Sequence, residues 1–87
     1  MNGWVYVLQS LKNDRYYIGC SENPERRVNE FHNLGKVKAT RYMKPWKLVF
    51  MQKFLNMTEA RRVEYKIKSF KSRRITEDIV GGRRILG

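Results

Sequence analysis

The chain has few of the residues that mark several large classes of protein. Its 87 residues include one cysteine, one histidine and two prolines. A single cysteine forms no internal disulfide, which is typical of a reducing compartment, and one cysteine with one histidine excludes a Cys/His zinc cluster. Apolar runs such as residues 5–8 and 48–51 stay far below the roughly 20 residues of a membrane span. Without a signal-peptide pattern, we expect a cytoplasmic protein (nucleoid-associated in a bacterium) that has no membrane partner and no disulfide partner.

Acidic residues are also scarce, and they are unevenly distributed. The chain carries 19 Lys and Arg against 8 Asp and Glu, a formal net charge of +11. Residues 1–35 hold four basic and four acidic side chains, whereas residues 36–87 hold fifteen basic and four acidic ones. A polyanionic partner relieves such self-repulsion, so the charge predicts DNA as the partner, with RNA as an alternative. A basic surface for solubility, or for an acidic protein, is the other interpretation.

The apolar content of 41% is sufficient for one folded domain, and its alternation predicts three strands. Residues 4–9 are apolar on both faces, which is typical of a central strand. Residues 12–14 have turn chemistry, and residues 15–19 return as a second strand. We expect this strand to end at Gly19, where the backbone passes close to a neighbouring group. Residues 46–54 predict a third strand whose one face carries Trp46, Leu48 and Phe50.

Three helices are predicted around these strands. The first has Asn23 as its N-cap and extends to about Asn33, with Gly35 just beyond. The second has Thr58 as its cap and ends near residue 70, and its apolar stripe consists of Ala60, Val63, Ile67 and Phe70. Ser72 caps a short third helix that Gly81 and Gly82 end. The predicted fold is therefore α+β, a small three-stranded antiparallel sheet flanked by helices in the order β-β-α-β-α-α, with one domain over residues 1–82 and a flexible tail over 83–87.

Two tyrosine motifs are placed eleven residues apart near the start of the chain. The first is Trp4-Val5-Tyr6 and the second is Tyr17-Ile18-Gly19; an arginine-rich helix with Arg27 and a lone mid-helix Glu64 follow. This order of parts resembles the GIY-YIG endonuclease superfamily, in particular its small stand-alone members and the N-terminal nuclease domain of UvrC. The second motif is intact, whereas Trp4 and Val5 replace the glycine and isoleucine of the first.

The resemblance implies a metal-dependent endonuclease that hydrolyses phosphodiester bonds in DNA, directed by DNA structure and related to repair or recombination. It implies that Tyr6 and Tyr17 position or deprotonate water. Arg27 would hold the scissile phosphate, for which a planar guanidinium is well suited. Glu64 would hold one Mg²⁺ or Mn²⁺, since one carboxylate with waters and a substrate phosphate is an ordinary site for such an ion.

His32 departs from the pattern of the superfamily. Many members have histidine or tyrosine four residues after the helix arginine, a position held here by Phe31, which we expect to pack against the sheet. One step further rotates a side chain by about 100°. His32 therefore reaches the site only if the helix ends or unwinds nearby; otherwise it interacts with the helix C-terminus. Phe31 and the degenerate first motif leave a second hypothesis, a nucleic-acid-binding module without activity, and a third, a module that binds an acidic protein.

Each candidate also has a structural interpretation. Tyrosines on strands are ordinarily packing residues, a helix arginine is usually solvated, and Glu64 has ion-pair partners at Arg61 and Lys68. Cys20 is expected to be a small packing residue. Two groups of basic residues are predicted to contact nucleic acid. They are Lys36, Lys38, Arg41 and Lys44 in a loop, and Lys68, Lys71 and Arg73 around the end of the second helix.

Overall fold

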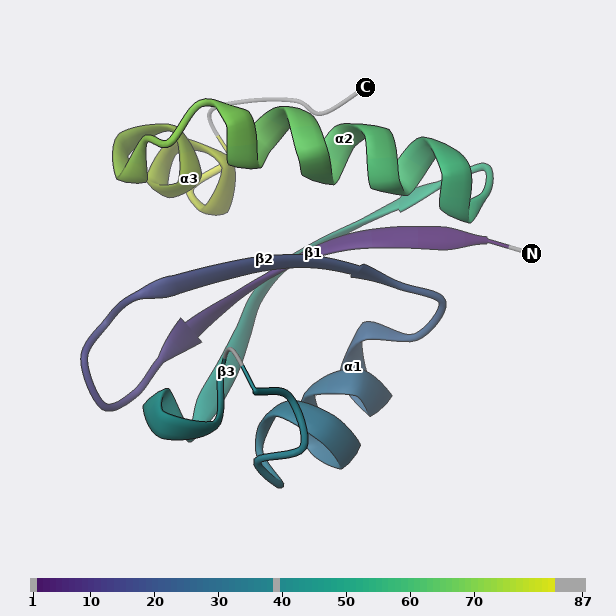
Figure 1. The fold of residues 1–87 in the computed structure, drawn as a ribbon. Coiled ribbons are helices and arrows are strands. Elements are labelled where there is room, and N and C mark those ends of the chain that lie inside the picture. The colour runs from purple at the N-terminus through teal and green to yellow at the C-terminus, as the bar shows by residue number, and fades with distance from the viewer. Residues whose placement is uncertain (1, 39, 83–87) are drawn as a thin grey trace.

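A computed structural model describes residues 2–38 and 40–82, apart from the side chain of Phe31. The chain forms one three-stranded sheet with helices on both faces, as Figure 1 shows, which confirms the predicted α+β fold and the order β-β-α-β-α-α. The predicted tail, residues 83–87, lies outside the described residues. Within the described part, none of the helices combines the length and apolarity needed to cross a membrane. The elements are β1 (Gly3–Ser10), β2 (Tyr16–Ser21), α1 (Pro24–Arg27), a π-helical turn (Val28–His32), a 3₁₀ turn (Arg41–Met43), β3 (Trp46–Phe54), α2 (Met57–Ser69) and α3 (Arg73–Val80).

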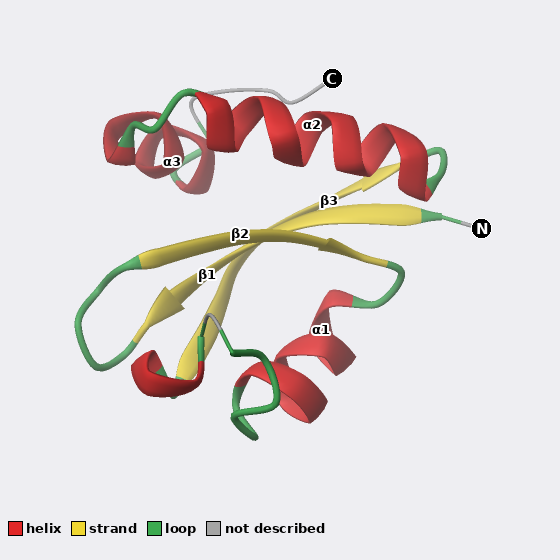
Figure 2. Cartoon of the chain, viewed as in Figure 1, coloured by secondary structure: helices red, strands yellow, loops and turns green. Residues whose placement is uncertain are grey.

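The sheet has the order β2-β1-β3 and is antiparallel throughout. The strand β1 is central, as predicted, and both of its faces are buried. Val5 packs with residues of α2 and α3 on one face, whereas Tyr6 and Leu8 pack on the other face with Val28 from the first helical segment. Figure 2 shows α2 and α3 on one side of the sheet and α1 on the other. This arrangement leaves β2 as an edge strand that both helical layers border.

A β-bulge in β3 makes one sequence prediction wrong. Leu8 pairs with Leu48 and Val7 pairs with Phe50, so β3 has one extra residue between them. Because an extra residue reverses the alternation of side chains, Phe50 lies on the face opposite to Leu48. Trp46 and Leu48 pack beside Tyr6, but Phe50 packs with the cluster below α2.

The strand β2 is longer than predicted at its C-terminal end. It continues through Gly19 to Ser21, and Gly19 lies opposite Tyr6 in the register. The expected close approach is nevertheless present, because a Cβ on Gly19 would lie 2.5 Å from the Tyr6 hydroxyl oxygen. The glycine therefore provides room for the Tyr6 side chain at the edge of the sheet.

The helix caps agree with prediction at two of three positions. Asn23 accepts a hydrogen bond from the Arg26 amide, and Ser72 accepts one from the Ile75 amide. The cap of α2 is Asn56 instead of Thr58, and its side chain accepts from the Glu59 amide at 2.9 Å. Phe70 also differs from the prediction, since it follows the last residue of α2 and is 46% exposed.

Candidate active site at the edge strand

A buried contact between a phenol and an imidazole lies at the centre of the site. The Tyr6 hydroxyl oxygen is 2.9 Å from Nε2 of His32. Tyr6 is 2% exposed and His32 is fully buried, so this contact is shielded from bulk water. A buried pair of this kind has a defined geometry, which is what proton transfer between two groups requires.

The π-helical turn brings His32 to this position. The amide of Asn33 donates to the carbonyl of Val28 at 2.9 Å, which is a hydrogen bond across five residues. A π-turn accommodates one residue more than an α-helical turn. His32, five residues after Arg27, is therefore turned toward Tyr6. Of the two alternatives that the sequence left open for His32, the structure shows the one in which the helix unwinds; the predicted packing of Phe31 lies outside the described side chains.

Thr40 holds the second nitrogen of the imidazole, and sequence reasoning missed it. The Thr40 hydroxyl oxygen is 2.8 Å from Nδ1 of His32 and donates to the carbonyl of Val37 at 3.4 Å. This network is compatible with the tautomer that carries its proton on Nδ1 and leaves Nε2 as the acceptor for the Tyr6 hydroxyl. The backbone carbonyl of Thr40 in turn accepts from the indole of Trp46 at 3.0 Å. Thr40 belongs to an irregular loop, where no periodicity signals its role.

The electrostatics of the site keep both partners uncharged. Burial, and next the charge of Arg27, lower the pKa of His32 to about 4. Burial and the neighbouring Tyr17 raise the pKa of Tyr6, whereas the charge and hydrogen bonding of Arg27 oppose that rise. Arg27 therefore lies close enough to act on both groups. The structure brings together three predicted site residues, Tyr6, Arg27 and His32.

Tyr17 extends the cluster along β2. Its ring centroid lies 5.1 Å from that of His32 and 6.3 Å from that of Trp46. The ammonium nitrogen of Lys68, which comes from α2, lies 5.5 Å from the centre of the same ring. Tyr17 is therefore the side chain at which groups from the two helical layers meet around the sheet edge.

Glu64 borders β2 from the other helical layer. Its side chain is 20% exposed and forms a 2.8 Å ion pair with Lys68. The predicted ion pair of Glu64 is therefore present. Burial, and next Glu64, raise the pKa of Cys20 to about 11. The thiol therefore stays protonated and packs at the core, as expected. Because Cys20 is the last residue but one of β2, this influence places Glu64 beside the C-terminal part of the edge strand.

The donor atoms available here fit one hard divalent ion. Both nitrogens of His32 have partners, and the thiol of Cys20 is protonated, so the soft and borderline ligands of zinc are not available. In residues 2–38 and 40–82 there is no group of three or more His, Cys, Asp or Glu suited to a metal. The carboxylate of Glu64 is an oxygen donor, and Mg²⁺ or Mn²⁺ binds through one carboxylate while it keeps several waters.

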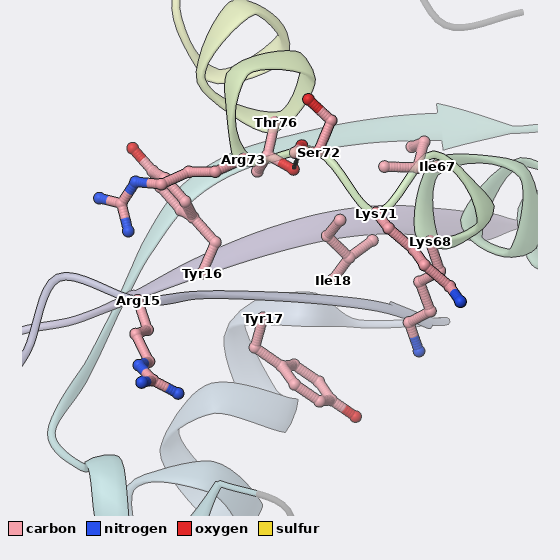
Figure 3. A pocket seen from close by; sticks show the side chains of 10 residues that line it. All are labelled: Arg15, Tyr16, Tyr17, Ile18, Ile67, Lys68, Lys71, Ser72, Arg73 and Thr76. Carbon is pink, nitrogen blue, oxygen red and sulfur yellow. Dashed lines mark hydrogen bonds between the residues drawn. The ribbon is translucent and has the colours of Figure 1, made fainter.

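Two cavities follow β2, and cations line both. One, of about 550 Å³, lies near the C-terminal end of the strand and includes Arg26, Arg27 and Arg61. The other, of about 380 Å³ and drawn in Figure 3, lies near the N-terminal end. Its cationic lining consists of Arg15, Lys68, Lys71 and Arg73.

Some of these cations were not among the predicted contacts. Sequence reasoning named Lys68, Lys71 and Arg73 but missed Arg15, Arg26 and Arg61. A helical signal for Arg61 exists, because Arg61, Glu64 and Lys68 are spaced at i, i+3 and i+7 and share one face of α2. The predicted loop cations are exposed and lie outside the linings of these two cavities. They are Lys36, Lys38, Arg41 and Lys44.

The geometry agrees with what comparisons with known proteins find. The model of the family described as the GIY-YIG catalytic domain matches residues 2–76. UPF0213 protein BH0048 of Halalkalibacterium halodurans is 38% identical over 81 residues, which cover 92% of this chain and 83% of that protein. UPF0213 protein NP_0776A of Natronomonas pharaonis is 38% identical over 82 residues, covering 90% of this chain and 94% of that protein. The solution NMR structure of the UPF0213 protein BH0048 from Bacillus halodurans has a TM-score of 0.57 and 34% identity, and the similarity covers 93% of this chain and 84% of that one.

Proposed function

The chain belongs to the GIY-YIG catalytic domain family, and from this premise we propose that it is a metal-dependent endonuclease that hydrolyses phosphodiester bonds in DNA. The observation that carries the proposal is the buried 2.9 Å contact between Tyr6 and a neutral His32, with Arg27 close to both. This arrangement places a proton acceptor behind a phenol, which is what a general-base role of Tyr6 requires.

In the proposed reaction, Tyr6 takes a proton from the attacking water while its own proton moves to Nε2 of His32. The proposal places the proton of His32 on Nδ1, which is 2.8 Å from the Thr40 hydroxyl oxygen, so that Nε2 offers a lone pair to the Tyr6 proton. The raised pKa of Tyr6 shows that the phenol does not ionise spontaneously in the free protein. Its ionisation needs positive charge nearby, and Arg27 supplies part of that charge.

Arg27 has a second role in the proposal, which is to hold the scissile phosphate. It lines the larger cavity together with Arg26, Arg61 and one acidic residue, Glu22, and Arg26 is paired with Glu30 at 2.8 Å. Guanidinium groups bind two phosphate oxygens at once and stabilise the charge that builds up during the displacement. Tyr17 borders the same edge and helps to position the water.

Glu64 is the residue that would hold the divalent ion. A bound Mg²⁺ or Mn²⁺ supplies charge stabilisation for the phosphate and the leaving oxygen. Lys68 is paired with the carboxylate in the free protein. If Glu64 held such an ion, Lys68 would give up this pair, and its ammonium group could then contact a neighbouring phosphate.

The test is a cleavage assay with labelled duplex, flap and single-stranded DNA in Mg²⁺, Mn²⁺ or EDTA. We expect cleavage only with metal, and a loss of about 100-fold or more in Arg27→Ala and in Glu64→Ala. Lys53→Ala, an exposed change on β3 at the opposite edge of the sheet, is the matched control and retains full activity. Salt-sensitive binding without cleavage on any substrate would favour the binding-module hypothesis instead.

A further inference from the structure

The smaller cavity has a lining that selects for anions. Arg15, Lys68, Lys71 and Arg73 contribute to it, and the lining contains no carboxylate. Arg73 is fixed in place, since it pairs with Glu77 at 3.1 Å and lies 5.0 Å from the ring centre of Tyr16. Lys68 and Arg73 are paired with Glu64 and Glu77, whose carboxylates lie outside the lining, so the cavity of about 380 Å³ has a cationic lining and a positive local potential.

Lys71 adopts a backbone conformation that is uncommon for a residue with a Cβ. Among the described residues, two that are not glycine have a positive φ, Asp14 at 61° and Lys71 at 50°. Asp14 is in the hairpin turn, and aspartate tolerates this region. Lys71 occupies the position after the end of α2, where glycine is the usual residue because it has no Cβ. A lysine here is strained, and such strain is a sign of a functional constraint.

The side chain of Lys71 points over the cavity. Figure 3 shows Lys71 extending alongside Lys68, away from α3, and both line the cavity. Lys68 is shared between this cavity and the site, because it pairs with Glu64 and lies over Tyr17. Along β2 the two cavities are centred near residues 17 and 21, which corresponds to about 13 Å of strand. A polymer of phosphates lying along β2 therefore reaches both.

We propose that this cavity is a second phosphate subsite, which binds a backbone phosphate of the DNA strand flanking the scissile one, and that Lys71 is its principal cation. The inference rests on the proposed function, because the ligand is the same nucleic-acid strand. It also specifies the path of the bound DNA, because the substrate strand would follow the edge strand β2 from Arg27 to Lys71.

The test measures binding without cleavage, by fluorescence anisotropy of labelled single-stranded and duplex oligonucleotides in EDTA over a series of KCl concentrations. We expect Lys71→Gln to weaken binding severalfold and to reduce the slope of log K against log salt by about 0.7 to 0.9. Lys53→Gln removes the same charge from the opposite edge and leaves the slope at its wild-type value. The same titration of Arg27→Ala measures how much the larger cavity contributes to DNA binding.

Lys71→Gly separates the subsite from effects on folding. Glycine relieves the positive φ, so we expect the melting temperature to rise by about 4 °C while the affinity falls as in Lys71→Gln. If both Lys71 variants bind like Lys53→Gln while the wild type binds DNA and Arg27→Ala does not, the subsite is refuted and the proposed function stands. If the wild type shows no salt-dependent binding, both proposals fail together.

Discussion

At the scale of single residues, burial decides the chemistry of the site. A tyrosine on a strand and a histidine at a helix end are ordinary residues, but here they share a 2.9 Å contact away from water. Burial keeps the imidazole neutral and the phenol protonated, and Arg27 favours both the neutral imidazole and the phenolate. The roles of Tyr6, Tyr17, Arg27 and Glu64 in catalysis stay predictions until the variants are assayed.

The lowered pKa of His32 predicts a stability that depends on pH. Its folded pKa, about 4, lies below the ordinary value of 6.5, so the unfolded chain binds more protons between these two values. The stabilisation is therefore complete above pH 6.5 and is lost as the pH falls toward 4. Urea unfolding should show a free energy of unfolding that is roughly 2 kcal/mol lower at pH 5 than at pH 7. An unchanged free energy in His32→Gln would assign the loss to His32; the same loss in that variant would contradict it.

Thr40 is expected to act through His32. Thr40→Val keeps the shape of the side chain but removes the hydroxyl that holds Nδ1, which costs about 1 to 2 kcal/mol of stability. The tautomer of His32 is then no longer determined, so we expect cleavage to fall by about tenfold or more. Nitrogen-15 NMR of the imidazole distinguishes this role from a purely structural one, because the populations of the two tautomers change. Thr40→Ser, which keeps the hydroxyl, should retain both activity and tautomer.

At the scale of elements, two irregularities position the site. The bulge in β3 reverses the alternation of side chains between Leu48 and Phe50. Leu48 therefore packs in the core on one face of the sheet and Phe50 in the core on the other. The π-turn at Val28–His32 absorbs one residue and thereby directs His32 at Tyr6. Both are one-residue insertions, and each changes which way a side chain points without changing the fold.

The π-turn makes a deletion testable. Removing the exposed Asn29 should convert the π-turn into a regular α-helical turn and leave the histidine four residues after Arg27. We expect a folded protein that retains cleavage, with a melting temperature within a few degrees of the wild type. The control is the deletion of exposed Lys66 from α2, which would rotate Ile67 out of the core and unfold the domain. If both deletions unfolded the protein, the π-turn would not tolerate the removal of a residue, and the prediction would be wrong.

At the scale of the whole molecule, the fold gathers basic residues from both parts of the sequence along one edge of the sheet. The net charge of +11 is carried by the second part of the sequence, but the fold brings Arg15, Arg26 and Arg27 from the first part to the same edge strand. The edge of β2 therefore has seven lining cations contributed by both parts. Such an edge is suited to a phosphate backbone and also discourages pairing with another strand.

The two predicted groups of contacts can be compared directly. Lys68, Lys71 and Arg73 form the predicted group beside the smaller cavity. Replacing all three by glutamine should reduce the slope of log K against log salt for DNA binding by about 2 to 3, since each phosphate contact contributes roughly 0.9. Replacing the four loop cations should have a smaller effect, because they do not line the cavities along β2. Anisotropy titrations in KCl measure both slopes, and a larger loss in the loop variant would place the DNA elsewhere. The four loop cations are Lys36, Lys38, Arg41 and Lys44.

The sequence by itself determined the order of elements, the central place of β1 and two of the three helix caps. These features follow from local rules, because alternation, turn chemistry and capping each act within a few residues. The motifs around Tyr6 and Tyr17 were also sufficient to indicate the family, which the match over residues 2–76 confirms. The true cap of α2 was missed because Asn56 and Thr58 are both good caps, and two residues do not separate them.

Only the tertiary structure decided the register of β3, the direction of His32 and the partner of its second nitrogen. A bulge or a π-turn costs little locally, so whether it forms depends on the packing of distant residues such as Val7 and Tyr6. Thr40 and Arg61 are far from the motifs in the sequence, and long-range contacts alone bring them to the site and to the edge of β2. Local patterns therefore predict which elements form, whereas the energy of the packed core determines which side chains share a site.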